Sequence, residues 1–418
     1  MKNKKLFIIG LIGNVLDHYD TALMIYLGSI MAPIFFKGDN NTSSLVMFYG
    51  VLSLSVFSRP LGSLIFSKIA NKSSPSRSLI ISLTGTAFAT FFMGFLPSYD
   101  SWGLSATILF CTIRFIQTFF GAGEHAVSLL FLMENAQEDS RSNIGAFFNC
   151  STMIGISLAS FASYLVNLSS NPLLYWRIPY FLGIITALVG LVLRLITYDK
   201  KLPQLYFKEN IKKISFLRVI KNNLKEILVI SILYIFSMMT YYIPFAFMND
   251  YISIIHPNFS KSQLLFHNTI FLYYDLALLI LIGILFKNIN YRKMILLSSA
   301  SLLIFALPAF LLLQINSILI IESVRFIIIT IGVMFCASFQ AYIYRICNPE
   351  YRYIIHGTGI VIGQDFIGRL TLSICLFLFH QFNSPIAPSF YIIFISFIAL
   401  ISVLLYKIQL HEKNNNQI

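Results

Sequence analysis

Long apolar stretches recur along the whole chain, separated by short polar segments. Each is long enough to cross the roughly 30 Å hydrocarbon core of a bilayer, which takes about 20 helical residues. Membrane-spanning helices are predicted near residues 6–36, 44–67, 79–97, 104–133, 143–167, 173–197, 227–255, 264–286, 293–314, 317–345, 353–380 and 387–408. The chain is therefore predicted to be an all-α membrane protein of twelve transmembrane helices in two sets of six.

Composition excludes a soluble protein of this length. Of the 418 residues 57% are hydrophobic and only 11% are charged, whereas a soluble domain carries about 25% charged residues. A signal peptide is the alternative for the first stretch, because lysines precede it. No small-residue cleavage site follows, and Asp17 interrupts the apolar run. A retained first transmembrane helix is therefore expected.

One long polar segment divides the two sets of spans. Residues 199–226 contain the basic side chains Lys200, Lys201, Lys208, Lys212, Lys213, Arg218, Lys221 and Lys225 against Asp199, Glu209 and Glu226. Basic segments can bind nucleic acid, but no aromatic or glycine-rich RNA motif accompanies this one, and cytoplasmic loops are basic by rule. We predict an N-terminal six-helix half (1–198), a basic cytoplasmic linker (199–226) and a C-terminal six-helix half (227–418), with no nucleic-acid partner.

The distribution of basic residues predicts the orientation. With both termini in the cytoplasm, the loops after the second and eighth spans lie inside together with the linker. The opposite side then receives Lys37 and Lys261. Richness in Ile, Lys, Asn and Phe is typical of AT-rich bacterial genomes. We expect a multi-pass protein of a bacterial inner membrane.

The first span contains two acids. An ionisable group at mid-membrane costs roughly 2.5 to 3.5 kcal/mol, so it is expected to face a partner, a wet cavity or the bundle interior. Asp17 and Asp20 stand three residues apart and share one helix face. One turn earlier, Gly13 and Asn14 are expected to let another backbone come close.

The fourth span carries a polar stripe. Arg114, Gln117, Gly121 and Glu124 follow at intervals of three, four and three, which places them along one helix face. A cation with two or more carboxyl groups in a cavity between the halves can hold a charged or zwitterionic solute together with a proton. The alternative is that Arg114 and the acids neutralise each other and lock the helices together.

Two histidines lie beside these acids. His18 and His125 are candidates for a proton relay. Hydrogen-bonded packing is the alternative for both.

The second half offers further ionisable residues within spans. These are Asp275, the pair Glu322 and Arg325 at spacing i,i+3, and Asp365 with Arg369 at i,i+4. Such spacings favour salt bridges within one helix. A role in the solute pathway is the equal alternative.

Direct drive by ATP is not expected. No G-x-x-x-x-G-K-[ST] loop is present, so the energy source is predicted to be an ion gradient. The five cysteines form no C-x-x-C pair and are expected to be packing residues. No nucleophile, metal or cofactor constellation appears, which argues against an enzyme, and the division into two halves argues against a channel.

Several motifs carry a family resemblance. Residues Gly13 to Asp20 resemble the pattern G-N-x-x-E-W-[YF]-D, with Asp17 for Glu and His18 for Trp, and Arg59 to Gly62 match R-P-L-G. Further matches in order are Pro97 to Tyr99, Gln117 with Gly123 and Glu124, Glu134 with Arg141, Trp176 to Tyr180, and Leu193 with Arg194. The chain resembles the metabolite:proton symporter family of the major facilitator superfamily, which includes proline/betaine, oxoglutarate, citrate and shikimate carriers.

The resemblance implies a major facilitator fold and alternating-access symport of a small polar metabolite with protons. Asp17, Asp20, Arg114, Gln117 and Glu124 are then expected to bind solute or couple protons. The implied partners are solute, protons and lipid bilayer, with the monomer as the functional unit and no cofactor.

Gating is the point at which the sequence departs from the family. After the second span the superfamily has G-x-x-x-D-[RK]-x-G-[RK]-x-[RK], whereas Ser67, Asn71 and Ser74 replace the glycines and the aspartate, and Lys72 and Arg77 remain. The resemblance assigns that aspartate to a latch of the outward-facing state. Arg59, Asn71, Lys72, Arg77 and Arg141 are the predicted gating residues, with snorkelling as the alternative for Arg59. A passive facilitator or exchanger, or a non-transporting membrane sensor, remains the alternative function.

Overall fold

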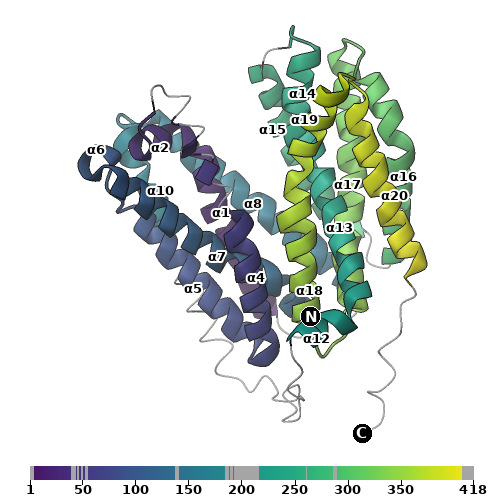
Figure 1. Ribbon diagram of the computed structural model, residues 1–418, viewed down its shortest axis with the longest axis horizontal. Helices are drawn as coiled ribbons and strands as arrows, with labels where there is room; N and C mark the ends of the chain where they lie inside the picture. The colour runs from purple at the N-terminus through teal and green to yellow at the C-terminus, as the bar shows by residue number, and fades with distance from the viewer. Residues whose placement is uncertain are drawn as a thin grey trace. The chain divides into compact units, whose positions relative to one another are not determined.

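The computed structural model is helical throughout the part of the chain that it describes, as predicted (Figure 1). That part comprises residues 4–38, 44, 47–48, 50–51, 55–136, 141–183, 188, 192, 216–259, 261–285 and 290–406. Within it, 7 helices are long and apolar enough to cross a membrane by length and composition.

The chain divides into two compact units, Met1–Ala136 with Ser151–Val219, and Gln137–Cys150 with Ile220–Ile418. The helices that supply the first unit are α1 (Lys4–Tyr26), α2 (Gly28–Phe35), α4 (Ser55–Lys72), α5 (Pro75–Met93), α6 (Tyr99–Trp102), α7 (Leu104–Glu134), α8 (Arg141–Leu168), α9 (Pro172–Tyr175) and α10 (Arg177–Phe181). The first residues of α8 belong to the second unit. Each of the first six predicted spans has a helix at its place, although most of 184–197 lies outside the described residues.

The second unit contains the remaining helices. They are α12 (Phe216–Asn222), α13 (Leu224–Tyr242), η4 (Ile243–Phe247), α14 (Met248–Ile255), α15 (Lys261–Leu285), α16 (Tyr291–Leu312), α17 (Ile318–Ile346), α18 (Arg352–Ile360), η5 (Val361–Ile367), η6 (Gly368–Leu370), α19 (Thr371–Phe382) and α20 (Ala387–Leu405). Of the predicted linker, residues 199–215 lie outside the described residues, and α12 and the start of α13 occupy the rest.

Two predicted spans are interrupted by π-helical turns. The span near 227–255 is α13, η4 and α14, and the span near 353–380 is α18, η5, η6 and α19. Pro244 lies in η4, where it cannot donate a backbone hydrogen bond. In η5, a Cβ added at Gly363 would lie 2.3 Å from the Ser231 carbonyl oxygen. Pro244 therefore supplies a local cause for the interruption at η4, and Gly363 lets η5 lie close to α13.

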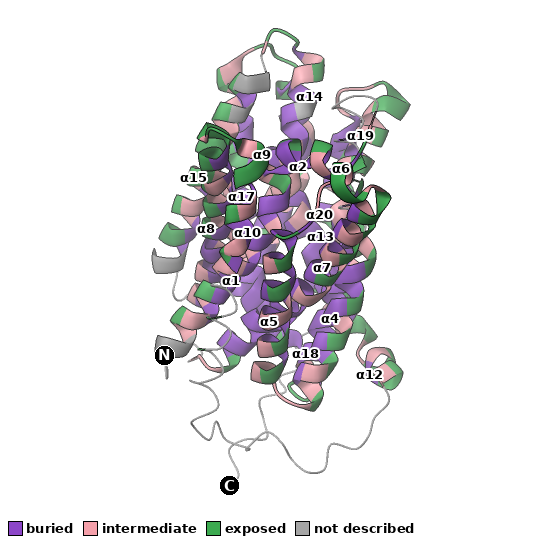
Figure 2. Ribbon diagram, turned by 90° about the vertical axis from the view of Figure 1, so that its left-hand side faces the viewer, coloured by how far each residue is buried: buried purple, intermediate pink, exposed green. Residues whose placement is uncertain are grey.

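The distribution of buried and exposed side chains is that expected of a protein embedded in a bilayer. Large apolar side chains lie on the outside, among them Phe57, Ile304 and Leu319, which are 66%, 75% and 73% exposed. Polar side chains lie inside, and Ser58 and Ser82 are fully buried. Figure 2 shows this pattern as green outer surfaces around a purple interior. An apolar exterior of this extent suits contact with hydrocarbon and not with water.

Glycines set the closest helix contacts of the first unit. A Cβ at Gly62 of α4 would lie 2.1 Å from the Phe119 carbonyl oxygen of α7, and a Cβ at Gly155 of α8 would lie 2.2 Å from the Val15 carbonyl oxygen of α1. Only a residue without a side chain fits at these crossings. The backbone of α1 is thereby held against α8.

Gly155→Ala is expected to destabilise the first unit, because the new methyl group overlaps the Val15 carbonyl oxygen. Overpacking of this kind costs about 1–3 kcal/mol. Thermal denaturation of the purified protein in detergent is expected to show a lower melting temperature. The control is Gly50→Ala, where a Cβ meets nothing within 4 Å. Equal melting temperatures for the two variants would contradict the proposed role of Gly155.

Candidate functional site

Two buried acids lie opposite glycines at the contact of α1 with α7. A Cβ at Gly121 of α7 would lie 2.9 Å from Oδ1 of Asp17, and a Cβ at Gly13 of α1 would lie 3.5 Å from Oε1 of Glu124. Asp17 is 3% exposed and Glu124 is 2% exposed. Each helix therefore presents one carboxyl group to a glycine of the other. The atoms nearest to a Cβ at Gly13 belong to side chains and lie at ordinary contact distances, whereas the close backbone approach predicted there is found at Gly155.

The polar stripe predicted on α7 is buried along its length. Arg114, Gln117, Gly121 and Glu124 are all buried. Arg114 Nη1 donates a hydrogen bond to Gln117 Oε1 over 2.6 Å, and Gln117 Nε2 donates to Thr90 Oγ1 of α5 over 2.7 Å. The guanidinium of Arg114 is thus positioned through Gln117 by a neighbouring helix.

Charges of both signs converge on the first helix. Asp17 interacts electrostatically with Arg59 of α4 and Arg114 of α7, and Glu124 interacts with Asp17. Arg59 is buried at 8% exposure, so its side chain lies inside the unit. Asp20 is fully buried, in electrostatic contact with Tyr180. Asp17, Asp20, Arg114, Gln117 and Glu124 all lie buried in the first unit, on α1 and α7, and their roles in solute binding and proton coupling stay predictions.

His18 and Asn14 attach this part of α1 to its surroundings. Asn14 Nδ2 donates to Ser151 Oγ and Thr152 Oγ1 of α8 over 2.7 and 2.9 Å. His18 Nδ1 lies 3.0 Å from the Asn14 carbonyl oxygen and 4.0 Å from Asp17 Oδ2. The rings of His18 and His125 are 6.3 Å apart between centroids. The two histidines are neighbours within the first unit, and their role as a relay stays a prediction.

The predicted gating residues at the end of α4 and the start of α5 lie at or near the surface. Lys72 and Arg77 are exposed and Asn71 is half-buried. Ser74 caps α5 by accepting from the Arg77 backbone N–H over 3.1 Å, and Arg77 Nη1 donates to Ser73 Oγ over 2.8 Å. The serine that stands in place of a family glycine therefore begins the next helix. The side chain of Arg141 lies outside the described residues.

The ionisable residues of the second unit are placed in three separate ways. Asp365 Oδ1 lies 3.7 Å from Arg369 Nε, which confirms the pair expected from their spacing. The pair expected between Glu322 and Arg325 is wrong, because Glu322 lies against His267 of α15. Arg325 Nη2 donates instead to neutral oxygens, those of Pro244, Asn249 and Asn268. Asp275 is buried at 7% exposure within an apolar cluster.

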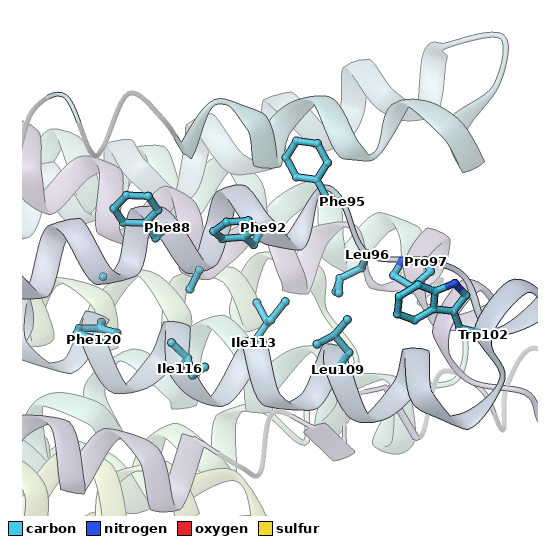
Figure 3. A pocket seen from close by; sticks show the side chains of 12 residues that line it. Phe88, Phe92, Phe95, Leu96, Pro97, Trp102, Leu109, Ile113, Ile116 and Phe120 are labelled. Carbon is cyan, nitrogen blue, oxygen red and sulfur yellow. The ribbon is translucent and has the colours of Figure 1, made fainter.

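An apolar groove of about 620 Å³ runs between α5 and α7 of the first unit (Figure 3). Phe88, Phe92 and Trp102 line it and are more than half exposed. No charged side chain lines it. The groove therefore suits acyl chains of the bilayer, and the buried polar cluster remains the candidate solute site. Among the described residues, no group of three or more His, Cys, Asp or Glu side chains is arranged to hold a metal ion.

Sequence reasoning did not find the contacts between each acid and the opposite glycine. It also missed Thr90 as the partner of Gln117, and the link from Asn14 to α8. The intervals within one helix show which residues share a face, but not which face of another helix they meet. The glycines at positions 13 and 121 were the available signal, since small residues mark close helix contacts.

Helices that expose apolar surface and bury arginine, glutamate and aspartate define the class of multi-spanning membrane carriers. Residues 11–366 match the sequence pattern that defines the Major Facilitator Superfamily. The chain therefore belongs to the major facilitator superfamily, a family of transporters with a twelve-helix fold, and not to an enzyme family.

Two relatives with names resemble this chain over most of its length. A Staphylococcus aureus (strain COL) protein named as a proline/betaine transporter is 27% identical over 424 residues, covering 96% of this chain and 88% of its own length. The proline/betaine transporter of Escherichia coli (strain K12) is 23% identical over 422 residues, with 96% and 83% covered.

Solved structures share the fold. The proton:xylose symporter XylE, bound to 6-bromo-6-deoxy-D-glucose, has a TM-score of 0.70 at 12% identity, covering 96% of this chain and 94% of that one. FucP in the outward conformation has a TM-score of 0.69 at 12% identity, with 96% and 99% covered.

Thr90→Val is expected to destabilise the site, because the buried Gln117 Nε2 group loses its acceptor. An unsatisfied buried donor costs about 1–3 kcal/mol. Thr112→Val is the matched control, since Thr112 is exposed to the surroundings and its hydroxyl bonds only within its own helix, to the Ile108 carbonyl. Thermal denaturation in detergent is expected to separate the two variants. A melting temperature for Thr90→Val equal to that of Thr112→Val would show that the Gln117 bond contributes nothing.

Proposed function

We propose that this chain is a secondary active transporter that moves a small zwitterionic solute of the proline or betaine class together with protons by alternating access. Its place is a bacterial inner membrane, with both termini in the cytoplasm and the monomer as the functional unit. The relatives named as proline/betaine transporters support the substrate class. The basic loops support the orientation.

The observation that carries this proposal is the buried cluster of one arginine and three acids on α1 and α7. A zwitterion carries one carboxylate and one cationic centre. Arg114 supplies the counter-charge for the carboxylate, and Gln117 holds its guanidinium in place. Asp17 and Asp20 supply negative charge for the cationic centre. A zwitterionic solute thus pairs its carboxylate with the arginine and its cationic centre with the acids, and each of these groups is costly to bury without such a partner.

Proton coupling follows from the two neighbouring carboxyl groups. Asp17 and Glu124 interact as like charges in a buried site. Two carboxylates in low dielectric resist being ionised together, so we propose that one of these two acids holds a proton while the other is ionised. Release of that proton as the solute leaves would couple the two movements. Arg59, which interacts with Asp17, is placed to sense this change, and Asn71, Lys72, Arg77 and Arg141 belong to the proposed gate.

The double variant Asp17→Asn with Glu124→Gln is expected to abolish solute accumulation driven by a pH gradient, because both of the carboxyl groups proposed to couple the proton, Asp17 and Glu124, are replaced by amides that do not titrate. Uptake of labelled proline and glycine betaine into proteoliposomes measures this. Asp100→Asn, at the exposed turn α6, is the control and is expected to accumulate solute like the unmodified protein.

If the double variant still accumulates solute under a pH gradient, Asp17 and Glu124 do not couple protons to transport. Counterflow without accumulation by the unmodified protein would identify an exchanger or facilitator instead. Solute binding with no translocation would identify a sensor.

Gly121→Ala is expected to lower the apparent affinity for solute about tenfold, equivalent to about 1.4 kcal/mol. The new Cβ would lie 2.9 Å from Asp17 Oδ1 and displace that carboxyl group. Gly13→Ala is the matched control, because its Cβ would meet Glu124 Oε1 at 3.5 Å, an ordinary contact. Concentration dependence of uptake compares the two. Equal affinities would argue that the position of Asp17 is irrelevant to binding.

A further inference from the structure

Asp275 lies in the middle of α15, within the apolar segment Phe266–Ile282. Its side chain is 7% exposed. The cluster of apolar side chains in this part of the second unit includes Cys150 of α8, Phe271 and Leu279 of α15, and Val333 of α17. A carboxyl group is therefore held among hydrocarbon side chains contributed by three helices.

No cation is paired with this carboxyl group in the described part of the chain. Oδ2 of Asp275 has no hydrogen-bond partner there, and no ion pair involves it. Two other acids within spans of this unit differ, since Glu322 lies against His267 and Asp365 lies against Arg369. Asp275 thus stands apart from the acids that are locked into ion pairs.

Arg325 of α17 reaches the same part of the second unit, but its hydrogen bonds go to other residues. Its guanidinium lies over the ring of Phe271, one helical turn before Asp275, at 5.0 Å. Its Nη2 group donates to the oxygens of Pro244, Asn249 and Asn268. The charge of Arg325 is therefore solvated by neutral acceptors and not by Asp275.

The titratable groups that face Asp275 are uncharged. Electrostatic contact links it to the thiols of Cys150 on α8 and Cys336 on α17. Cys336 Sγ lies 3.5 Å from Ser237 Oγ of α13. On α15 itself, the neighbouring Tyr274 hydroxyl bonds Thr330 Oγ1 of α17 over 2.8 Å.

The elements before α15 add no compensating charge either. Tyr241 of α13 packs against the cluster. The residues of η4 are apolar, and the Tyr251 hydroxyl of α14 donates to the Pro385 carbonyl. The described surroundings thus offer thiols and phenols, all neutral near pH 7.

We infer that Asp275 is a proton-binding site of the second unit, neutral in this structure and ionised at another stage of the transport cycle. An ionised carboxylate without a cation in such a site carries a large desolvation cost, whereas the neutral acid carries much less. The proton leaves when water or a cation reaches the carboxylate, and it returns when the apolar cluster closes again. The inference rests on the proposed function only in linking this proton to solute movement.

An apolar carbodiimide tests the proton directly. Dicyclohexylcarbodiimide adds to a protonated carboxyl group within apolar surroundings, the acid proton moving to nitrogen and the carboxyl oxygen bonding to the central carbon, and the adduct rearranges to a stable N-acylurea. The full chain in liposomes is treated in acidic, neutral and alkaline buffers, and mass spectrometry measures modification of the α15 peptide. We expect labelling of Asp275 that falls as pH rises and is absent in Asp275→Asn. No labelling at any pH, or equal labelling at every pH, would overturn the inference.

Transport supplies the second readout. Asp275→Asn is expected to lose accumulation under a pH gradient while keeping solute counterflow, which needs no net proton movement. Asp275→Glu retains a titratable carboxyl group, so its pH-dependent labelling is expected to persist, which guards against misfolding as the cause. Full accumulation by Asp275→Asn would remove Asp275 from coupling. If the unmodified protein transports neither proline nor glycine betaine, the proposed function fails, and the labelling still decides whether Asp275 exchanges a proton.

Discussion

The structure depends on how a carboxyl group is accommodated within hydrocarbon. A carboxyl group there needs a counter-charge or a hydrogen-bonding shell if it is ionised, or a proton that keeps it neutral. The acids of this chain differ in which of these they have. Asp365 has Arg369 beside it, Asp17 has the fields of Arg59 and Arg114, and Asp275 has neither. These differences separate acids that have a cation beside them from Asp275, the acid that we propose to exchange a proton. Function in a transporter requires the second kind, and stability favours the first.

Small residues make these arrangements possible. Gly121 lets the carboxyl group of Asp17 approach the axis of α7, and Gly155 lets α1 approach α8. The acids therefore lie at helix crossings and not at the lipid-facing surface. A larger side chain at such a crossing would move the acid and the backbone together, so the positions of the charges and the packing of the helices are set by the same residues.

Sequence alone predicted much of the fold. The positions of the spans followed from apolar length, because a bilayer imposes about 20 residues on each helix. The stripe on α7 followed from helical spacing, and its residues are buried as expected. The expected pair of Glu322 with Arg325 was wrong, because spacing within one helix gives no information about His267, which lies on α15. Contacts between helices, such as Gln117 with Thr90, needed three-dimensional structure. The interruption at η4 had a visible cause in Pro244, but a proline alone does not specify a π turn.

The π turn at η4 has a mechanical consequence. A helix normally owes its stiffness to its own ladder of backbone hydrogen bonds. At η4 the carbonyl oxygen of Pro244 accepts a hydrogen bond from Arg325 of α17, with Nη2 at 2.8 Å. The same nitrogen also contacts Asn249 of α14 and Asn268 of α15. One side chain of α17 therefore bridges the π turn, the helix that follows it and α15, so displacement of the Arg325 guanidinium would release three contacts of this span at once.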